Sequence, residues 1–411
     1  MVMPELAAHL KVSTSVSGTW LIDLSQRLSQ SPNINLFIAC VYGDKFRKIT
    51  IGHITYFLLP GTGKNLLFYT KKYKKYWDII CDEIDIDIVH LHGTEYSHGL
   101  SFLRYHPEVK ALVSIQGLLT RIKDEDFGGL KLGEVLRNRT LREFFKFNGM
   151  LELHFLHIKN AKYEEEIIRR CSYAHHINSW DGSITQNINP NIILFQSEYN
   201  LRSEFYFAKK WKFSLCDQYT IFTNPGDHPL KGLHVLLKAI AIVRKKYPKV
   251  KLYVPGFSAG NPMVKLTSGY SKLIRRLIKK LDIGENVSFI GPQNSSQMVE
   301  YMQKSHIVVI PSSIEGSSLI LREAMYIGSP CIASFRGGMV DYLHDKSDGF
   351  FYDFIEHTVL ADRIIRLFSS ADLCESFSNN AVIKAEKLNN PSENSMKVTE
   401  MYNTILAQNK N

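Results

Sequence analysis

Residues 307–334 read IVVIPSSIEGSSLILREAMYIGSPCIAS, and two apolar runs in this stretch enclose a segment with helical periodicity. The first run, Ile307–Ile310, predicts a buried strand, and Ser317–Ile327 predicts a helix. The Gly-Ser-Pro that follows favours a helix end, and Cys331–Ser334 then predicts another strand. A strand, a helix and a second strand in this order are typical of a parallel sheet covered by helices.

The same alternation extends through the second half of the chain. Three more strands are expected at 219–223, 250–254 and 287–290, and three more helices at 233–246, 272–281 and 296–304. Strands and helices that alternate on this scale indicate a complete Rossmann-like domain, which we place at 217–388. The chain has 411 residues, too many for one ordinary hydrophobic core, so a second domain is expected before it.

The first half, taken as a domain at 1–210, shows a weaker pattern. A helix is expected at 18–29, strands at 35–40, 84–91 and 111–115, and a long helical stretch at 130–170. The residues before Gly18 make a poor buried strand, so the first strand of this domain is either irregular or missing. The tail at 390–411 has apolar residues at helical spacing and predicts an amphipathic helix that needs a surface to cover.

The composition excludes several classes of protein. The apolar fraction of 45% and the charged fraction of 22% are ordinary for a globular protein, and no uncharged apolar run of about 18 residues predicts a membrane-spanning helix. The six cysteines are scattered, which fits reduced thiols in a cytosolic protein and predicts no zinc site. The formal net charge of +10 suits partners rich in phosphate: nucleotides, nucleic acid or an anionic membrane.

The turn that precedes the predicted helix is the strongest candidate site. Glu315 lies in this turn, at the carboxyl edge of the predicted sheet, where open α/β sheets bind ligands. The backbone N–H groups of Ser317, Ser318 and Leu319 are free in the first helical turn, which together with the helix dipole suits a diphosphate. Glu323 follows near two helical turns later, so both carboxylates can accept hydrogen bonds from ligand hydroxyls. The alternative is structural: Glu315 caps the helix and Glu323 is a solvated helix residue.

Glu315 and Glu323, separated by seven residues and followed by Ala-Met and Gly-Ser-Pro, resemble the donor-site motif of retaining family 4 glycosyltransferases, the glycosyl transferases group 1. The segments 335–338 (FRGG) and 348–351 (DGFF) are also similar to that family. The resemblance covers nearly the whole chain and is most specific at 219–354. It implies the GT-B fold: an α/β protein of two Rossmann-like domains facing a cleft, with the C-terminal helix crossing back to the N-terminal domain.

The resemblance assigns the catalytic residues to the C-terminal domain. Glu315 contacts the transferred sugar, and Lys231, in the segment 229–232 (PLKG), reaches phosphate oxygens of the leaving group. Glu323 binds the ribose hydroxyls, and the further donor-binding residues are Gly316, Ser317, Ser318, Leu319, Gly18, Asn224 and Gly291. The family usually has an arginine shortly before this lysine, whereas this chain has NPGDH at 224–228. Either Lys231 acts alone or another cation replaces the arginine; by itself, a lysine in a loop is usually only a surface residue.

The segment 87–99 (DIVHLHGTEYSHG) resembles the acceptor-side loop of the same family. The resemblance marks the acceptor-side residues as His92, Glu95, His98 and Gln116, although many relatives have a histidine near the position of Gln116. The histidines of this region, including His90, have two other interpretations: metal ligands, or buried side chains that are simply hydrogen-bonded. We expect no metal at this site.

The resemblance implies a metal-independent glycosyltransferase without a cofactor, which moves a sugar with retention from a nucleoside-diphosphate sugar to a glycan or lipid-linked saccharide. It further implies surface polysaccharide biosynthesis, such as that of capsule or lipopolysaccharide, and a cytoplasmic location with peripheral attachment to the inner face of the cell membrane. An alternative is a non-catalytic homologue that acts as a binding or scaffold subunit. It is supported by three departures from the family: the missing arginine, the irregular or missing first strand, and Gln116. A GT-B-like epimerase or phosphorylase is a third alternative, against which the two glutamates count.

Two stretches mix cations with aromatic rings. They are 69–77 (YTKKYKKYW) and 137–147, where Arg137, Arg139, Arg142 and Lys146 accompany Phe144, Phe145 and Phe147. Three interpretations stay open: a solvated helix face over buried aromatic residues, a contact with an anionic membrane, or a contact with nucleic acid. Lipid-linked acceptors are frequent in the family, which favours a membrane over nucleic acid, and membrane recovery of the protein should then fall at high salt.

Overall fold

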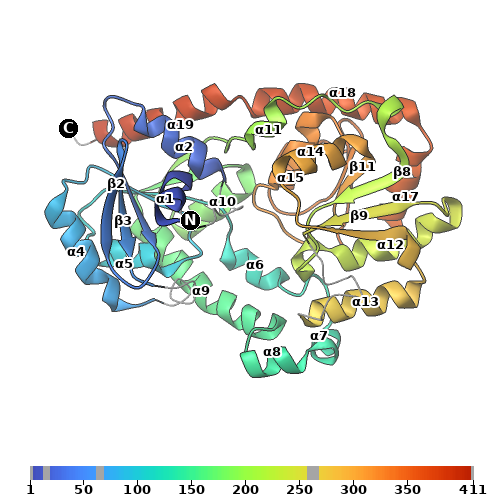
Figure 1. Cartoon of the computed structure of the whole chain (residues 1–411), viewed down its shortest axis with the longest axis horizontal. Helices are drawn as coiled ribbons and strands as arrows, with labels where there is room; N and C mark the ends of the chain where they lie inside the picture. The colour runs from blue at the N-terminus through green and yellow to red at the C-terminus, as the bar shows by residue number, and fades with distance from the viewer. Residues whose placement is uncertain (1–2, 13–18, 62–68, 257–267, 409–411) are drawn as a thin grey trace. The chain divides into compact units, whose positions relative to one another are not determined.

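The computed structural model describes residues 3–12, 19–61, 69–256 and 268–408, and the chain forms two compact units (Figure 1). The first unit comprises Met1–Thr120, Ile158–Asn200 and Asn389–Asn411, and the second comprises Arg121–His157 and Leu201–Leu388. Each unit is therefore assembled from segments that are separated in the sequence.

The first unit contains a four-stranded parallel sheet in the order β4-β5-β6-β7. Its strands are β4 (Val89–His92), β5 (Ala111–Ser114), β6 (Tyr173–His176) and β7 (Ile193–Gln196). Helices of this unit include α2 (Thr19–Ser29), α4 (Lys74–Glu83), α5 (Ser97–Tyr105), the second part of α9 (Met150–Arg170) and α10 (Ser179–Ile188). All residues of β5 are buried, as expected of an apolar strand that is paired on both sides in a helix-covered sheet.

A second sheet of the first unit has the order β1-β3-β2. In it, β3 (Ile54–Leu59) pairs in parallel with β1 (Leu36–Val41) and antiparallel with β2 (Arg47–Ile51). The sequence pattern predicted only β1, because β2 begins with two exposed cations and none of its residues is fully buried. Phe57 and Val113 belong to one core cluster, so the two sheets share a hydrophobic core.

The second unit contains a six-stranded parallel sheet in the order β10-β9-β8-β11-β12-β13. The strands are β8 (Asp217–Thr223), β9 (Lys251–Pro255), β10 (Val287–Gly291), β11 (Ser305–Ile310), β12 (Cys331–Ser334) and β13 (Phe350–Tyr352). Counted within this unit the order is 3-2-1-4-5-6, the strand order of the Rossmann fold. The order reverses between β8 and β11, and such sheets bind ligands beyond the carboxyl ends of the strands at this point.

The helices around this sheet include α12 (Leu233–Lys246), α13 (Gly269–Leu281), α14 (Ser295–Lys304), α15 (Leu319–Ile327), α17 (His357–Phe368) and α18 (Ala371–Leu388). Four of these six were predicted closely, although α13 begins three residues earlier and α15 two residues later than expected, and α17 and α18 were not predicted. α15 begins at Leu319 and not at Ser317, because Ser318 has a non-helical backbone conformation and forms the N-cap. In the first unit, β4 begins at Val89 and not at Ile84, because the N–H of Ile84 caps α4.

The segment 121–157 departs from the expected domain range of 1–210, because it belongs to the second unit. It contains most of α6 (Leu119–Glu125), then α7 (Leu132–Asn138), α8 (Leu141–Lys146) and the start of α9. His234 Nε2 in α12 lies 2.9 Å from the carbonyl oxygen of Gly128, and Glu143 accepts a 2.7 Å hydrogen bond from the Gly269 N–H. These contacts, with the packing of α7 against α13, hold the segment on the second unit.

The C-terminal helix α19 (Pro391–Ala407) belongs to the first unit. This agrees with the expectation that the C-terminal helix crosses back to the N-terminal domain. Its buried residues include Val398, Met401 and Ile405. The ammonium of Lys110 donates a 3.0 Å hydrogen bond to the carbonyl oxygen of Ile405, which ties the helix to the start of β5. Across the described residues, no helix is both long and apolar enough to cross a bilayer.

Candidate functional site

The two predicted catalytic residues are in direct contact in the second unit. Lys231 Nζ lies 2.8 Å from Glu315 Oε1. The hydroxyl of Ser312 donates a 2.6 Å hydrogen bond to the same oxygen. The amide of Asn224 donates to the Ser312 hydroxyl at 2.8 Å, and Asn224 is buried at the end of β8. A continuous polar chain therefore joins the carboxyl ends of β8 and β11.

Close backbone approaches fix the loops that carry these two residues. A Cβ on Gly232, which has φ of +67°, would lie 1.7 Å from the carbonyl oxygen of Pro311. A Cβ on Gly337, with φ of +59°, would lie 2.1 Å from the carbonyl oxygen of Glu315. Only glycine fits both the positive φ and the space. The Lys-Gly pair and the first glycine of FRGG thus position the turn of Glu315.

Burial lowers the pKa of Lys231, but the adjacent Glu315 carboxylate outweighs this effect and the pKa is raised. Lys231 is therefore an ammonium at neutral pH. A fixed cation beside the carboxyl end of the sheet can bind an anionic leaving group as negative charge develops on it.

Glu323 has a different partner, which the sequence pattern did not reveal. Its carboxylate is fully buried in α15 and accepts two hydrogen bonds from the Arg202 guanidinium, at 2.7 and 2.6 Å. Arg202 precedes the short helix α11 (Ser203–Tyr206) and lies 121 residues away in the chain. No local motif marks such a long-range partner.

Of the three amides predicted for the first helical turn, that of Leu319 lies in α15, whereas Ser317 and Ser318 precede the helix. The N–H groups of Leu321 and Arg322 bond to the Ser318 carbonyl at 3.0 and 3.2 Å, so the amides of Leu319 and Ile320 are the ones without an intrahelical acceptor. The Arg322 side chain is buried and donates a 3.3 Å hydrogen bond to the Ser317 hydroxyl. It adds a second cation beside the turn, which the sequence analysis did not identify.

Three glycines complete the donor-side set. Gly316 follows Glu315 in the turn. Gly291 ends β10 with φ of +70°, and its carbonyl accepts a 2.6 Å hydrogen bond from the N–H of Gly256. A Cβ on Gly291 would contact nothing within 4 Å, so the backbone here is accessible from one side. Gly18 lies outside the described residues.

The predicted acceptor-side residues gather in the first unit. His92 ends β4, Glu95 lies in the loop before α5, His98 lies in the first turn of α5, and Gln116 follows β5. A Cβ on Gly93, which has φ of +90°, would lie 2.4 Å from Glu95 Oε2 and 3.3 Å from Gln116 Oε1. Gly93 therefore lets the carboxylate and the amide approach the same stretch of backbone.

These four side chains share an unusual property. Each has a buried polar atom without a hydrogen-bond partner among the described residues: His92 Nδ1, Glu95 Oε2, His98 Nδ1 and Gln116 Nε2. Burial raises the pKa of Glu95 to about 7 and lowers the pKa of His92 to about 3 and of His98 to about 4. The two imidazoles are thus neutral at physiological pH. Buried polar atoms usually have a partner in folded proteins, so the gathering of these four marks a candidate binding site.

His90 belongs to a different arrangement. Its Nδ1 lies 2.7 Å from the Tyr402 hydroxyl of α19, and its Nε2 lies 2.6 Å from the Ser114 hydroxyl. Ser114 in turn lies 2.8 Å from His175 Nδ1, and His175 Nε2 lies 2.9 Å from the carbonyl oxygen of Ser197. This chain of hydrogen bonds supports the interpretation of His90 as a buried, hydrogen-bonded histidine. In the described part of the chain, no three histidine, cysteine, aspartate or glutamate side chains lie close enough together to hold a metal ion.

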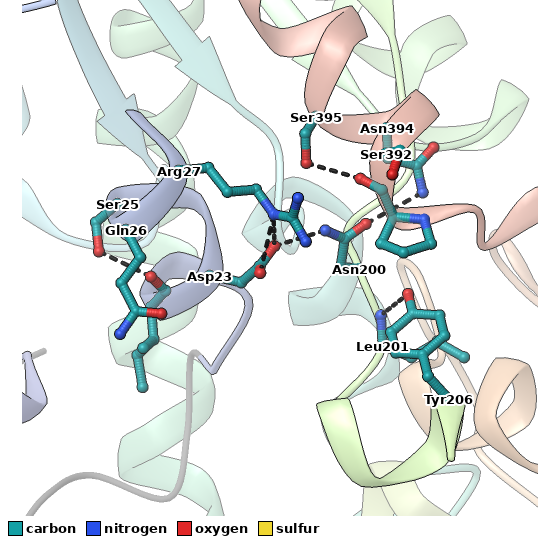
Figure 2. Close-up of polar contacts among 12 residues, drawn as sticks. Asp23, Ser25, Gln26, Arg27, Asn200, Leu201, Tyr206, Ser392, Asn394 and Ser395 are labelled. Atoms are coloured by element: carbon teal, nitrogen blue, oxygen red, sulfur yellow. Dashed lines mark hydrogen bonds and ion pairs between the residues drawn. The ribbon is translucent and has the colours of Figure 1, made fainter. Parts of the chain in front are cut away.

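A small cavity of about 30 Å³ lies beside this hydrogen-bond chain. Its lining includes Trp20, His90, His175 and Asn200. Figure 2 shows Asn200 between α2 and α19: its amide donates to Asp23 at 2.6 Å, and its carbonyl accepts from Asn394 at 3.4 Å. The volume is close to that of one water molecule, too small for a sugar.

The two basic, aromatic stretches have opposite outcomes. In the first, Tyr73 and Trp77 are buried, as the interpretation of a solvated face over buried rings requires. In the second, that interpretation is wrong: Phe144, Phe145 and Phe147 are 52%, 74% and 74% exposed. In this segment Asn138 and Glu143 are buried instead of the rings.

Residues 210–383 match the family model described as Glycosyl transferases group 1. Curated relatives include the D-inositol 3-phosphate glycosyltransferases of Corynebacterium urealyticum, 28% identical over 145 residues, and of Mycolicibacterium smegmatis, 30% identical over 125 residues. These matches cover 35% and 30% of this chain, and 33% and 27% of the relatives. The chain therefore spans about a third or less of the length of the curated relatives it matches.

Solved structures match over nearly the whole chain. Sucrose-phosphate synthase of Thermosynechococcus elongatus has a TM-score of 0.70 at 14% identity and covers 95% of this chain and 93% of its own. HepE of Anabaena, in complex with UDP and glucose, has a TM-score of 0.67 at 13% identity and covers 95% and 97%. A glycosyltransferase of Rickettsia africae has a TM-score of 0.62 at 16% identity and covers 96% of both chains. At these identities the matches establish the fold.

Proposed function

Because residues 210–383 match the family model of the glycosyl transferases group 1 and the chain has the GT-B fold of two Rossmann-like domains, we propose that the protein transfers a sugar, with retention, from a nucleoside-diphosphate sugar. The observation that carries the proposal is the contact between Lys231 and Glu315. It joins a fixed cation to a carboxylate at the reversal point of a Rossmann-type sheet, beside the amino end of α15.

In this proposal, the second unit binds the donor. Lys231 and the first amides of α15 bind the diphosphate and stabilise it as it leaves. Arg322 adds positive potential in place of the arginine that the family usually has and this chain lacks. Glu315 accepts hydrogen bonds from hydroxyls of the sugar. Glu323 accepts hydrogen bonds from the ribose hydroxyls. It uses the lone pairs that its two hydrogen bonds from Arg202 do not occupy. The leaving phosphate takes the acceptor proton, so the scheme uses no separate base, metal or cofactor.

The acceptor is a glycan or a lipid-linked saccharide, bound through the unpartnered atoms of His92, Glu95, His98 and Gln116 in the first unit. Neutral imidazoles and an amide both donate and accept hydrogen bonds, which matches the hydroxyls of a saccharide. We place the reaction in surface polysaccharide biosynthesis, for capsule or lipopolysaccharide, in the cytoplasm and peripherally at the membrane.

The test is a turnover screen of UDP-, GDP- and ADP-sugars in the presence of a chelator, with saccharide acceptors and D-inositol 3-phosphate offered in turn. UDP-sugars are tried first, because structural neighbours were solved with UDP. Glu315→Ala and Lys231→Ala should each reduce turnover by about 10²- to 10³-fold. The exposed residues Glu285 and Lys246 supply matched controls, Glu285→Ala and Lys246→Ala, which should leave it unchanged.

Each part of the proposal has its own contrary result. A product of inverted anomeric configuration, read by NMR, contradicts retention, and loss of turnover on chelation contradicts a metal-free scheme. Donor binding without any turnover supports the alternative of a non-catalytic scaffold subunit.

A further inference from the structure

Exposed apolar side chains are concentrated on the segment that contains α7, α8 and the start of α9. Of the twenty large apolar side chains that are exposed among the described residues, seven lie within residues 132–155. They are Leu132, Leu136, Leu141, Phe144, Phe145, Phe147 and Phe155. Scattered exposed apolar residues are normal, whereas a concentration of this kind marks an interaction surface. We call residues 131–155 the apolar hairpin.

The apolar hairpin is held firmly, so its exposure is not the result of a loose loop. Glu143 is buried and accepts hydrogen bonds from the Thr140 N–H at 2.9 Å and from the Gly269 N–H of α13 at 2.7 Å. Arg276 of α13 donates to the side chain of Asn138 at 3.2 Å. The buried polar residues Asn138 and Glu143 thus hold the hairpin to the protein, while the seven leucine and phenylalanine side chains are exposed.

Positive charge surrounds the exposed rings. Lys131, Arg137, Arg142 and Lys146 are exposed on the same segment, whereas Glu134 is its one exposed carboxylate among the described residues. Within the described ranges, no ion pair involves Arg137 or Lys146. A surface of this composition is complementary to one that is apolar beneath a layer of negative charge.

We propose that the apolar hairpin docks on an anionic lipid surface, with its leucines and phenylalanines in the acyl boundary and its cations among the headgroups. Nucleic acid fits less well, because bases stack on accessible aromatic faces, whereas three of the seven apolar side chains are leucines and the rings of Phe144 and Phe145 are perpendicular, at 5.5 Å. The proposal does not depend on the transfer chemistry, since none of these residues belongs to the donor or acceptor set.

The experiment is flotation of the full chain with vesicles of phosphatidylcholine alone and of phosphatidylcholine mixed with phosphatidylglycerol. The wild type should float only with the anionic vesicles, and less at high salt. Phe145→Ser/Phe147→Ser should reduce this binding at least about tenfold. The matched control Phe207→Ser/Leu215→Ser removes two apolar side chains that are 89% and 73% exposed elsewhere in the second unit, and should bind like the wild type.

A second pair of variants tests the charges without touching the apolar residues. Arg137→Glu/Lys146→Glu should weaken the binding, while Lys245→Glu/Lys249→Glu, an equal charge change on exposed residues in the last turn of α12 and just beyond it, should have a smaller effect. Circular dichroism melting confirms that each variant is folded. Donor turnover is measured separately without vesicles and should be unchanged in all four variants, so a failed turnover screen would not affect this result.

Three outcomes overturn the proposal. The wild type does not bind anionic vesicles, or the Phe145→Ser/Phe147→Ser variant binds as well as the wild type. In the third, the wild type is a dimer by light scattering and this variant is a monomer, which assigns the surface to a second copy of the chain.

Discussion

The predicted site residues of the two units differ in whether their polar groups have partners within the protein. In the second unit, the motif residues are paired within the protein: Lys231 with Glu315, and Glu323 with Arg202. In the first unit, the motif residues His92 and Glu95 have buried polar atoms with no partner among the described residues. The sequence motifs predicted both sets as site residues. The paired residues stabilise the second unit, whereas the unpaired buried atoms destabilise the first.

The difference shows that a candidate site can be assembled in two ways. Paired charges are held in position before a ligand binds, and the ligand must compete with the existing partner. Unpaired buried atoms cost folding free energy, which a ligand with complementary hydroxyls would recover on binding. Variants that break a pair and variants that remove an unpaired group should therefore change stability in opposite directions.

The largest effect is expected from Arg202→Ala, because it leaves the fully buried Glu323 carboxylate without its partner. Loss of one member of a buried ion pair costs about 3–5 kcal/mol of the free energy of unfolding. Hydrogen exchange of α15 peptides measures this loss locally. As a control, Arg366→Ala breaks an exposed pair with Asp362 and should cost about 0–1 kcal/mol. Equal losses in the two variants would contradict the stabilising role of the buried pair.

An intermediate effect is expected from acid on the histidine chain of the first unit. Burial lowers the pKa of His175 to about 4, below its unfolded value, so the stabilising contribution is complete above the unfolded pKa and is lost as the pH falls toward 4. A shift of this size corresponds to roughly 3 kcal/mol. Urea unfolding at about pH 7 and about pH 5 measures the loss. In His175→Gln the pH dependence should be weaker, and an unchanged dependence would exclude His175 as the group that titrates.

The smallest effect, with the opposite sign, is expected from Glu95→Gln. Burial raises the pKa of Glu95 to about 7, so its contribution to stability is present at acid pH and is lost as the pH rises through 7. Since the side chain is partly exposed, we expect the glutamine variant to be more stable by only about 1–2 kcal/mol at alkaline pH and similar to the wild type at acid pH. Thermal melting across this range measures the difference. The exposed Glu285→Gln provides the control, and a variant that is less stable at alkaline pH would refute the prediction.

The sequence predicted the second unit better than the first, for physical reasons. Strands such as β11 and β12 are buried throughout, so continuous apolar runs mark them, and Gly328 with Pro330 marks a helix end. The strand β2 carries exposed cations and pairs at a sheet edge, so its residues have no apolar pattern to reveal it. The helices of 130–170 were merged into one stretch, because the break at Phe147 depends on an αL backbone conformation that its residue type does not favour.

For the candidate site, local patterns were sufficient only for residues that lie close together in the chain. Glu315 and the amides of α15 come from one turn, so the spacing of the motif placed them. Arg202 and Arg322 were missed, because their roles depend on long-range packing and on the direction in which a buried side chain points. The unpartnered state of His98 is likewise a property of its surroundings, which no spacing reports.

The position of α19 has a consequence for how the protein is made. This helix follows the whole second unit in the chain, yet Ile405 lies in a core cluster with Leu112 and Tyr173 of the first unit. On the ribosome, the first unit can complete this cluster only after every residue of the second unit has been synthesised. The half that is translated first thus cannot finish folding until the end of the chain has been made, and until then Leu112 and Tyr173 lack the packing that Ile405 supplies.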